Sequence, residues 1–139
     1  MPLHIHSRVL DQMIRHSRRE LPLECCGLLT GVRELIDGVV PTTNERRSPT
    51  EFSIPPRQLF AFFKKLRKES REFQGIYHSH PRTEARPSQR DCEEFYYPEV
   101  SYWIVSLKDD RPDIRCFRWS KMGFCEIRYE VGNYAHEQR

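Results

Sequence analysis

Residues 78–91 read HSHPRTEARPSQRD, and this stretch decides how the rest of the chain is interpreted. The run FQGIY directly before it predicts a strand that continues through His78 and His80. Side chains two positions apart on a strand point to the same face, so the two imidazoles can converge on one point. Asp91 follows Ser88 by three residues, which places both on one side of a short helix expected to reach about residue 96.

Two imidazoles and a carboxylate form the ligand set of a catalytic zinc site, in which three protein ligands leave a fourth position for water. These ligands suit zinc better than magnesium or calcium, which prefer shells made of oxygen atoms alone. Other interpretations of the same residues stay open. Ser88 and Asp91 also fit a helix-capping pattern, and a single strand histidine is more often packed or solvated than metal-bound. The spacing alone therefore predicts a candidate metal site.

The spacing resembles the signature of the JAMM (MPN-plus, JAB-type) zinc metalloprotease family: His-x-His, seven residues, Ser, two residues, Asp. This chain matches every fixed position of that signature. Upstream, residues 22–31 (PLECCGLLTG) are similar to the family's run around its glutamate, and residues 51–56 (EFSIPP) and 75–77 (GIY) are also similar. The resemblance extends over about residues 3–131 and points to the short prokaryotic branch of the family.

The resemblance implies a fold, a metal and a role for each site residue. The fold is α/β, a curved mixed β-sheet with flanking helices of the JAMM/MPN (cytidine-deaminase-like) type. His78, His80 and Asp91 would bind one zinc ion per chain. Glu24 would be the general base that takes a proton from the zinc-bound water, because a carboxylate that is not a ligand remains free to move protons. Ser88 would stabilise the oxyanion of the tetrahedral intermediate.

The family also implies an activity, the hydrolysis of a peptide or isopeptide bond. Members that process ubiquitin chains carry inserted segments, for which this chain has little room, whereas short prokaryotic relatives resemble enzymes that act on ubiquitin-like sulfur-carrier proteins. We therefore expect cleavage at the C-terminal tail of such a carrier or of its cysteine adduct, with the tail bound at a sheet edge beside the zinc. The alternatives are a deubiquitinase-like isopeptidase and a non-catalytic MPN scaffold.

Composition and charge agree with a small globular enzyme. Leu, Ile, Val and Phe make up 33 of 139 residues, above the disordered range of under roughly 20%. A formal net charge of +3, with acids and bases interleaved, gives no argument for nucleic acid. No apolar run reaches membrane length and no secretory h-region opens the chain. We expect one cytoplasmic domain over residues 1–139, frayed beyond about 132, with no membrane or nucleic-acid partner; a homodimer is one open oligomeric state.

The remaining periodic segments predict two further helices and several strands. Expected helices cover residues 7–19 and a segment opened by Pro55 and Pro56. That second helix carries an apolar stripe, Leu59, Phe62, Phe63 and Leu66. Expected strands lie near residues 24–31, 36–43, 73–80, 101–107, 112–119 and 124–131.

Several other side chains are candidates for chemistry. The five cysteines are expected to be reduced thiols, most of them buried, and a ligand or redox role for Cys92 beside Asp91 is a weaker alternative. Arg82, Arg86 and Arg90 could bind a carboxylate or an acidic carrier, although solvated loop arginines are commoner. The other histidines are expected at the surface: His4, His6, His16 and His136.

Overall fold

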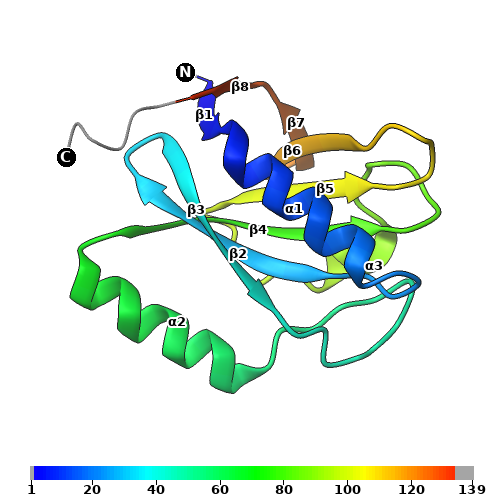
Figure 1. Cartoon of the computed structure of the whole chain (residues 1–139), viewed down its shortest axis with the longest axis horizontal. Coiled ribbons are helices and arrows are strands. Elements are labelled where there is room, and N and C mark those ends of the chain that lie inside the picture. Colours follow the sequence, from blue (N-terminus) through cyan, green and yellow to red (C-terminus); the bar gives the residue numbers. More distant parts are fainter. Residues whose placement is uncertain (1, 134–139) are drawn as a thin grey trace.

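The computed structural model describes residues 2–133, which form one eight-stranded sheet and three helices (Figure 1). The elements are β1 (Leu3–His6), α1 (Ser7–Arg19), β2 (Cys26–Val32), β3 (Leu35–Thr42), α2 (Pro56–Glu69), β4 (Glu72–His80), α3 (Gln89–Glu93), β5 (Ser101–Ser106), β6 (Asp113–Ser120), β7 (Gly123–Ile127) and β8 (Tyr129–Gly132). The strand order is β7-β6-β5-β4-β2-β3-β1-β8. Parallel pairing of β1 with β3 and β8, and of β4 with β5, makes the sheet mixed. The predicted α/β fold is confirmed.

Helices α1 and α2, on either side of the sheet, begin and end at capping residues of the local sequence. The imidazole of His6 caps α1 by accepting a hydrogen bond from the N–H of Arg8. Pro56 occupies the first position of α2, and Ser70 ends this helix in the left-handed conformation, with φ of 54°. In Figure 1, α1 crosses one face of the sheet and α2 lies below β2 and β3.

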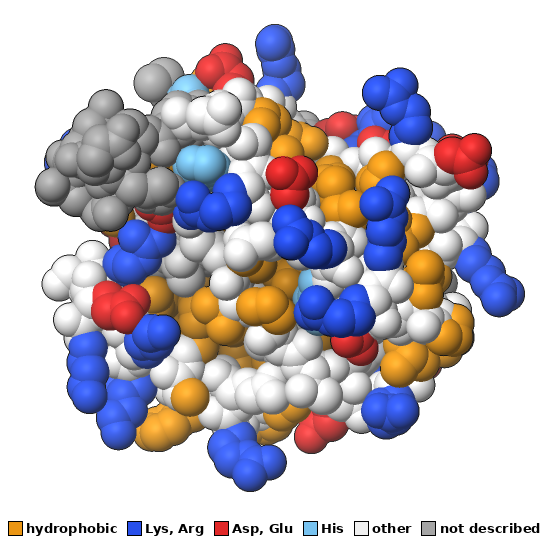
Figure 2. All heavy atoms as spheres, viewed as in Figure 1, with side chains coloured by type: hydrophobic (Ala, Val, Ile, Leu, Met, Phe, Trp, Pro, Cys, Tyr) orange, Lys and Arg blue, Asp and Glu red, His pale blue; other side chains and the backbone are white. Residues whose placement is uncertain are grey.

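Each face of the sheet carries its own apolar core. The core under α1 consists mainly of Leu3, Ile5, Val9, Met13, Leu29, Ile36, Tyr77, Trp103 and Val105. The core on the other face consists mainly of Leu28, Phe62, Leu66, Ile76, Tyr102, Ile104 and Phe117. Alternating residues of a strand therefore separate the two cores, as the strand period requires. Figure 2 shows hydrophobic side chains in a hollow between α2 and the sheet, where a cavity of about 310 Å³ lies.

Four features of the fold differ from the sequence-based expectation. The pattern does not predict β1, whose four residues are too few to show alternation. The strand expected over 124–131 is two strands, because the chain leaves β6 after Ile127 and pairs with β1 at the opposite end of the sheet. The helix expected to reach residue 96 ends at Glu93. The expected sheet edge beside the site is not found at β4, which pairs with β2 and β5.

The surface placement expected for the histidines is wrong at two positions. His6 is buried as the α1 cap, and His16 is buried with its Nδ1 atom 2.7 Å from the hydroxyl of Tyr77. His16 follows Val9 by seven residues and therefore lies on the same buried helix face. His136 and most of the tail expected to fray lie outside the described residues. Within residues 2–133, no helix combines the length and apolar character needed to cross a membrane.

Candidate metal centre

β4 and α3 bring the three predicted ligands together. The Nε2 atoms of His78 and His80 are 3.1 Å apart, and each lies 3.3 Å from Oδ2 of Asp91. In a tetrahedral zinc site with bonds of about 2.0–2.1 Å, neighbouring ligand atoms are separated by about 3.3–3.4 Å. The three donor atoms therefore form a triangle of the size that one zinc ion requires.

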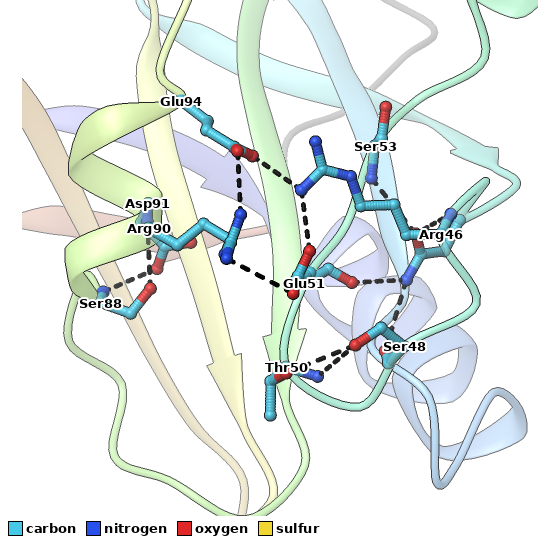
Figure 3. Close-up of polar contacts among 10 residues, drawn as sticks. Arg46, Ser48, Thr50, Glu51, Ser53, Ser88, Arg90, Asp91 and Glu94 are labelled. Carbon is cyan, nitrogen blue, oxygen red and sulfur yellow. Dashed lines mark hydrogen bonds and ion pairs between the residues drawn. The ribbon is translucent and has the colours of Figure 1, made fainter.

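A capping box at the start of α3 orients the carboxylate of Asp91. The N–H of Ser88 donates to Oδ2 of Asp91 at 2.8 Å, and Oγ of Ser88 accepts from the N–H of Asp91 at 3.1 Å (Figure 3). The capping interpretation and the metal interpretation of these two residues are thus compatible. Because Oγ of Ser88 acts as an acceptor in this bond, its hydroxyl proton stays available for another partner.

Glu24 lies just before β2, and strand register places it beside the two histidines. Cys26 pairs with His78, and the backbone N–H of Cys25 donates to Oγ of Ser79 at 2.8 Å. Ser79 therefore faces away from the two imidazoles, as predicted. The buried carboxylate of Glu24 and the two imidazoles offer ligand atoms that all lie within 4.8 Å of one another. Its Oε1 atom has no hydrogen-bond partner among the described residues.

The buried amide of Asn44 joins Glu24 to a loop formed by residues 44–53. Its Nδ2 atom donates to the carbonyl oxygens of Glu24, at 3.0 Å, and Glu51, at 2.9 Å. Its Oδ1 atom accepts from two N–H groups of the same loop, at 3.1 and 3.2 Å. One side chain therefore fixes both the loop and the backbone that carries Glu24.

Neighbouring groups also orient the two imidazoles. The ring of Phe52, from the 44–53 loop, stacks on His78 with centroids 4.6 Å apart and planes 20° apart. Nδ1 of His80 lies 2.7 Å from the carbonyl oxygen of Glu84. We therefore assign the proton of His80 to Nδ1, which leaves the Nε2 lone pair directed into the site. Nδ1 of His78 has no partner within the part of the chain that the structure describes.

Burial and charge set the protonation states in the site. Burial, followed by the carboxylates of Asp91 and Glu51, raises the pKa of Glu24 to about 9. Burial also lowers the pKa of His78, which keeps this ring neutral and able to bind a metal. Burial acts to raise the pKa of Asp91, but the two imidazoles and the Ser88 N–H outweigh it and hold that pKa well below its usual range. A cation among these groups would therefore be stabilised by Asp91.

An apolar cavity of about 260 Å³ adjoins the centre next to Asp91. Aromatic side chains on its walls include Phe52, Phe95, Tyr97 and Tyr102, and charged side chains of the 44–53 loop and the α3 segment also line it. Such a concave apolar space beside a polar cluster is typical of a ligand-binding site.

The remaining candidate residues lie outside the donor cluster. Arg82 is exposed, Arg86 pairs with Glu84 at 3.2 Å, and Arg90 pairs with acidic side chains. The thiol of Cys92 is exposed and is not part of the cluster of described metal-type ligands. Sequence reasoning missed the contributions of Asn44, Phe52 and Arg46, although the similarity of residues 51–56 to the family included one of them.

A buried imidazole pair, a carboxylate on a short helix and a buried carboxyl oxygen without a partner among residues 2–133 form the donor set expected of a metal-dependent hydrolase. Residues 6–120 match the family described as prokaryotic homologs of the JAB domain. A CysO-cysteine peptidase of Mycobacterium tuberculosis is 32% identical over 117 residues, which cover 82% of this chain and 80% of the relative. The chain therefore belongs to the prokaryotic JAB family.

Two further comparisons agree with this assignment. A probable TtuB-protein conjugate cleaving protease of Thermus thermophilus is 38% identical over 93 residues, which cover 66% of this chain and 62% of the relative. The solution structure of a Desulfitobacterium hafniense protein superposes with a TM-score of 0.89 and 33% identity, covering 97% of this chain and 96% of that one. The predicted JAMM-type family, fold and peptidase class are confirmed.

Proposed function

We propose that this chain is a zinc-dependent peptidase that cleaves at the C-terminal tail of a ubiquitin-like sulfur-carrier protein or of its cysteine adduct. The observation that carries the proposal is the 3.1–3.3 Å triangle of donor atoms beside the unpartnered Oε1 of Glu24. The relatives named as a CysO-cysteine peptidase and a TtuB-protein conjugate cleaving protease support the kind of substrate.

His78, His80 and Asp91 would hold the zinc, which supplies a bound water with a pKa of about 7. Glu24 would take the proton from that water and pass it to the leaving amine. Its pKa of about 9 makes it protonated at neutral pH in the metal-free site. A cation nearby favours the carboxylate form, so Glu24 acts as a base once the metal site is filled.

Ser88 would donate its hydroxyl proton to the oxyanion that forms on the attacked carbonyl. The capping bond from the Asp91 N–H fixes the Oγ atom at the start of α3 without using that proton. A preorganised donor of this kind is typically worth about 3 kcal/mol in the transition state.

The substrate tail would reach the centre along the cavity beside Asp91, which residues of the 44–53 loop and the α3 segment line. Both sides of β4 are occupied by β2 and β5, so the tail does not extend the sheet at the histidines. The cavity of about 260 Å³ offers the tail another path to the centre. A Gly-Gly sequence at the cleaved bond would allow the backbone to approach the centre without a side-chain clash.

Replacement of Glu24 by Gln tests the proposal. The variant should keep stoichiometric zinc and lose about a hundredfold to ten-thousandfold in hydrolysis, because an amide cannot accept the proton. Glu45→Gln, at an exposed position within the 44–53 loop, is the matched control and should leave zinc content and hydrolysis unchanged. Zinc is measured by elemental analysis, and cleavage of a sulfur carrier bearing a cysteine adduct by mass spectrometry.

The substrates offered decide between the alternatives. Cleavage after Gly-Gly that stops with a chelator supports the carrier-tail peptidase. Faster cleavage of ubiquitin conjugates would favour the deubiquitinase-like alternative, and equal cleavage of unstructured peptides would indicate a general peptidase. A protein that binds zinc but cleaves none of these substrates would favour the scaffold alternative.

A further inference from the structure

α3 is too short to fix Asp91 by its own helical structure. The helix has five residues, whereas an isolated helix needs about 12–15 residues to be even marginally stable in water. The capping box orients Asp91 relative to Ser88, which belongs to the same short segment. Phe95 packs against Tyr102 just beyond the helix, with ring centroids 5.2 Å apart. Asp91 is the central residue of this short helix, so its position also depends on contacts between α3 and other parts of the molecule.

Four charged side chains supply such contacts as a closed ring of ion pairs (Figure 3). Nη1 of Arg46 lies 2.9 Å from an oxygen of Glu51 and 2.9 Å from an oxygen of Glu94. Arg90 lies 3.5 Å from the other oxygen of Glu51 and 3.1 Å from the other oxygen of Glu94. Each arginine thus contacts both glutamates. The ring links the 44–53 loop to the α3 segment on both sides of Asp91.

The 44–53 loop also contacts the other parts of the centre. Asn44 holds the backbone of Glu24, and Phe52 stacks on the ring of His78. A displacement of the loop from α3 would therefore alter the position of Asp91 relative to both Glu24 and His78.

We propose that Arg46 and Glu51 are positioning residues that hold Asp91 in place through Arg90 and Glu94. This inference rests on the proposed function, in which Asp91 is a zinc ligand. The ring side chains are partly exposed, and exposed ion pairs contribute little to the global free energy of unfolding. The ring acts locally, because Arg90 and Glu94 flank Asp91, whereas the aromatic contacts of the segment are made by Phe95, beyond the end of the helix.

Arg46→Met tests the ring, since Met keeps an apolar stem and removes the charge. Zinc affinity, measured by competition with a chromophoric chelator, should fall about tenfold, the low end of what loss of a group that supports a ligand costs. Arg115→Met is the matched control. It removes the ion pairs with Asp113 and Glu126, at a similarly exposed position on β6, and should leave zinc affinity unchanged.

A reversed ring separates charge pairing from side-chain packing. The quadruple variant Arg46→Glu, Glu51→Arg, Arg90→Glu, Glu94→Arg keeps the alternation of charges. It also puts Glu before Arg at i and i+4, the favourable order on a helix. Its zinc affinity should return to within about threefold of the wild type. Failure of this rescue, or equal losses in Arg46→Met and Arg115→Met, would overturn the proposal.

Hydrogen exchange on the metal-free protein keeps this test independent of the proposed function. The N–H groups of Cys92 and Glu94 donate to carbonyl oxygens of Ser88 and Arg90 within the α3 segment. Both amides should exchange about threefold to tenfold faster in Arg46→Met and at the wild-type rate in Arg115→Met. Unchanged exchange would refute the ring as an anchor, whereas a wild-type protein that binds no zinc would refute the proposed function alone.

Discussion

The two faces of β4 carry side chains of opposite character. On the face toward α1, Tyr77 and Ser79 lie among apolar side chains and their polar atoms are paired, with His16 and with the backbone of Cys25. On the other face, His78 and His80 meet Asp91 and Glu24, and buried polar atoms remain without partners. Buried polar groups in native proteins are nearly always hydrogen-bonded. Among the described residues, the exceptions lie on the face that carries the candidate metal centre.

A comparison of two buried histidines makes the difference specific. Nδ1 of His16 is hydrogen-bonded to the hydroxyl of Tyr77, 2.7 Å away. His78 is fully buried, its Nε2 atom faces His80 and Asp91, and its Nδ1 atom has no partner among residues 2–133. Burial therefore does not distinguish a structural histidine from a candidate metal ligand, but the set of partners does.

The largest expected effect is the loss of zinc from His78→Ala. A structural zinc ion with four protein ligands contributes about 10–16 kcal/mol, so loss of one ligand costs about 2.5–4 kcal/mol, or about seventyfold to seven-hundredfold in affinity. His4→Ala, at a half-buried position on β1, is the matched control and should bind zinc normally. Elemental analysis and chelator competition measure both proteins. Stoichiometric zinc in His78→Ala would show that the donor triangle is not the metal site.

A smaller effect is expected from Ser88→Ala. Loss of an oxyanion donor should slow turnover about a hundredfold or more while zinc is retained. Loss of the cap should also lower the free energy of unfolding by about 1 kcal/mol. Ser88→Thr, which keeps a hydroxyl and a capping oxygen, should restore most of both properties. If Ser88→Ala lost stability but kept normal turnover, Ser88 would be only a cap.

Much of the site was predictable because its spacing is local. His78 and His80 share a strand face by the two-residue period, and Ser88 and Asp91 share a helix turn. The place of Glu24 required the family resemblance, since 54 residues separate its neighbour Cys25 from Ser79, to which Cys25 is bonded. A pattern within one segment cannot show which distant strand will pair with it.

The parts that sequence reasoning missed depend on contacts between segments. Asn44 occupies an irregular stretch, and only the folded loop shows that its amide bonds to Glu24. The ion-pair ring around Arg46 could not be predicted from the sequence for the same reason, because its partner Glu94 lies 48 residues away along the chain. β7 and β8 read as one strand because nothing at Arg128 marks the point where the chain leaves one end of the sheet for the other.

The smallest expected effect concerns the face of β4 toward α1, where the polar groups are hydrogen-bonded. It is tested through the pH dependence of the free energy of unfolding. Burial lowers the pKa of His16 below its ordinary value of 6.5, an effect that outweighs the opposing influence of Glu20. The unfolded chain therefore binds a proton at this residue at a higher pH than the folded protein does. Stability contributed by the neutral ring is present above about pH 6.5 and is lost as the pH falls below it.

His16→Gln removes this titration while leaving a side chain that can bond to the hydroxyl of Tyr77. The stability advantage of the wild type over the variant should shrink by about 1 kcal/mol between pH 7.5 and 5.5, within the limit of about 1.4 kcal/mol per pH unit. Urea unfolding of the chelated proteins at both pH values measures the difference. The titration of the buried groups of the candidate metal centre, His78 and Glu24, is common to both proteins and cancels. A constant difference would mean that His16 is protonated in the folded protein as readily as in the unfolded chain, and that the α1 face is more open to water than its packing indicates.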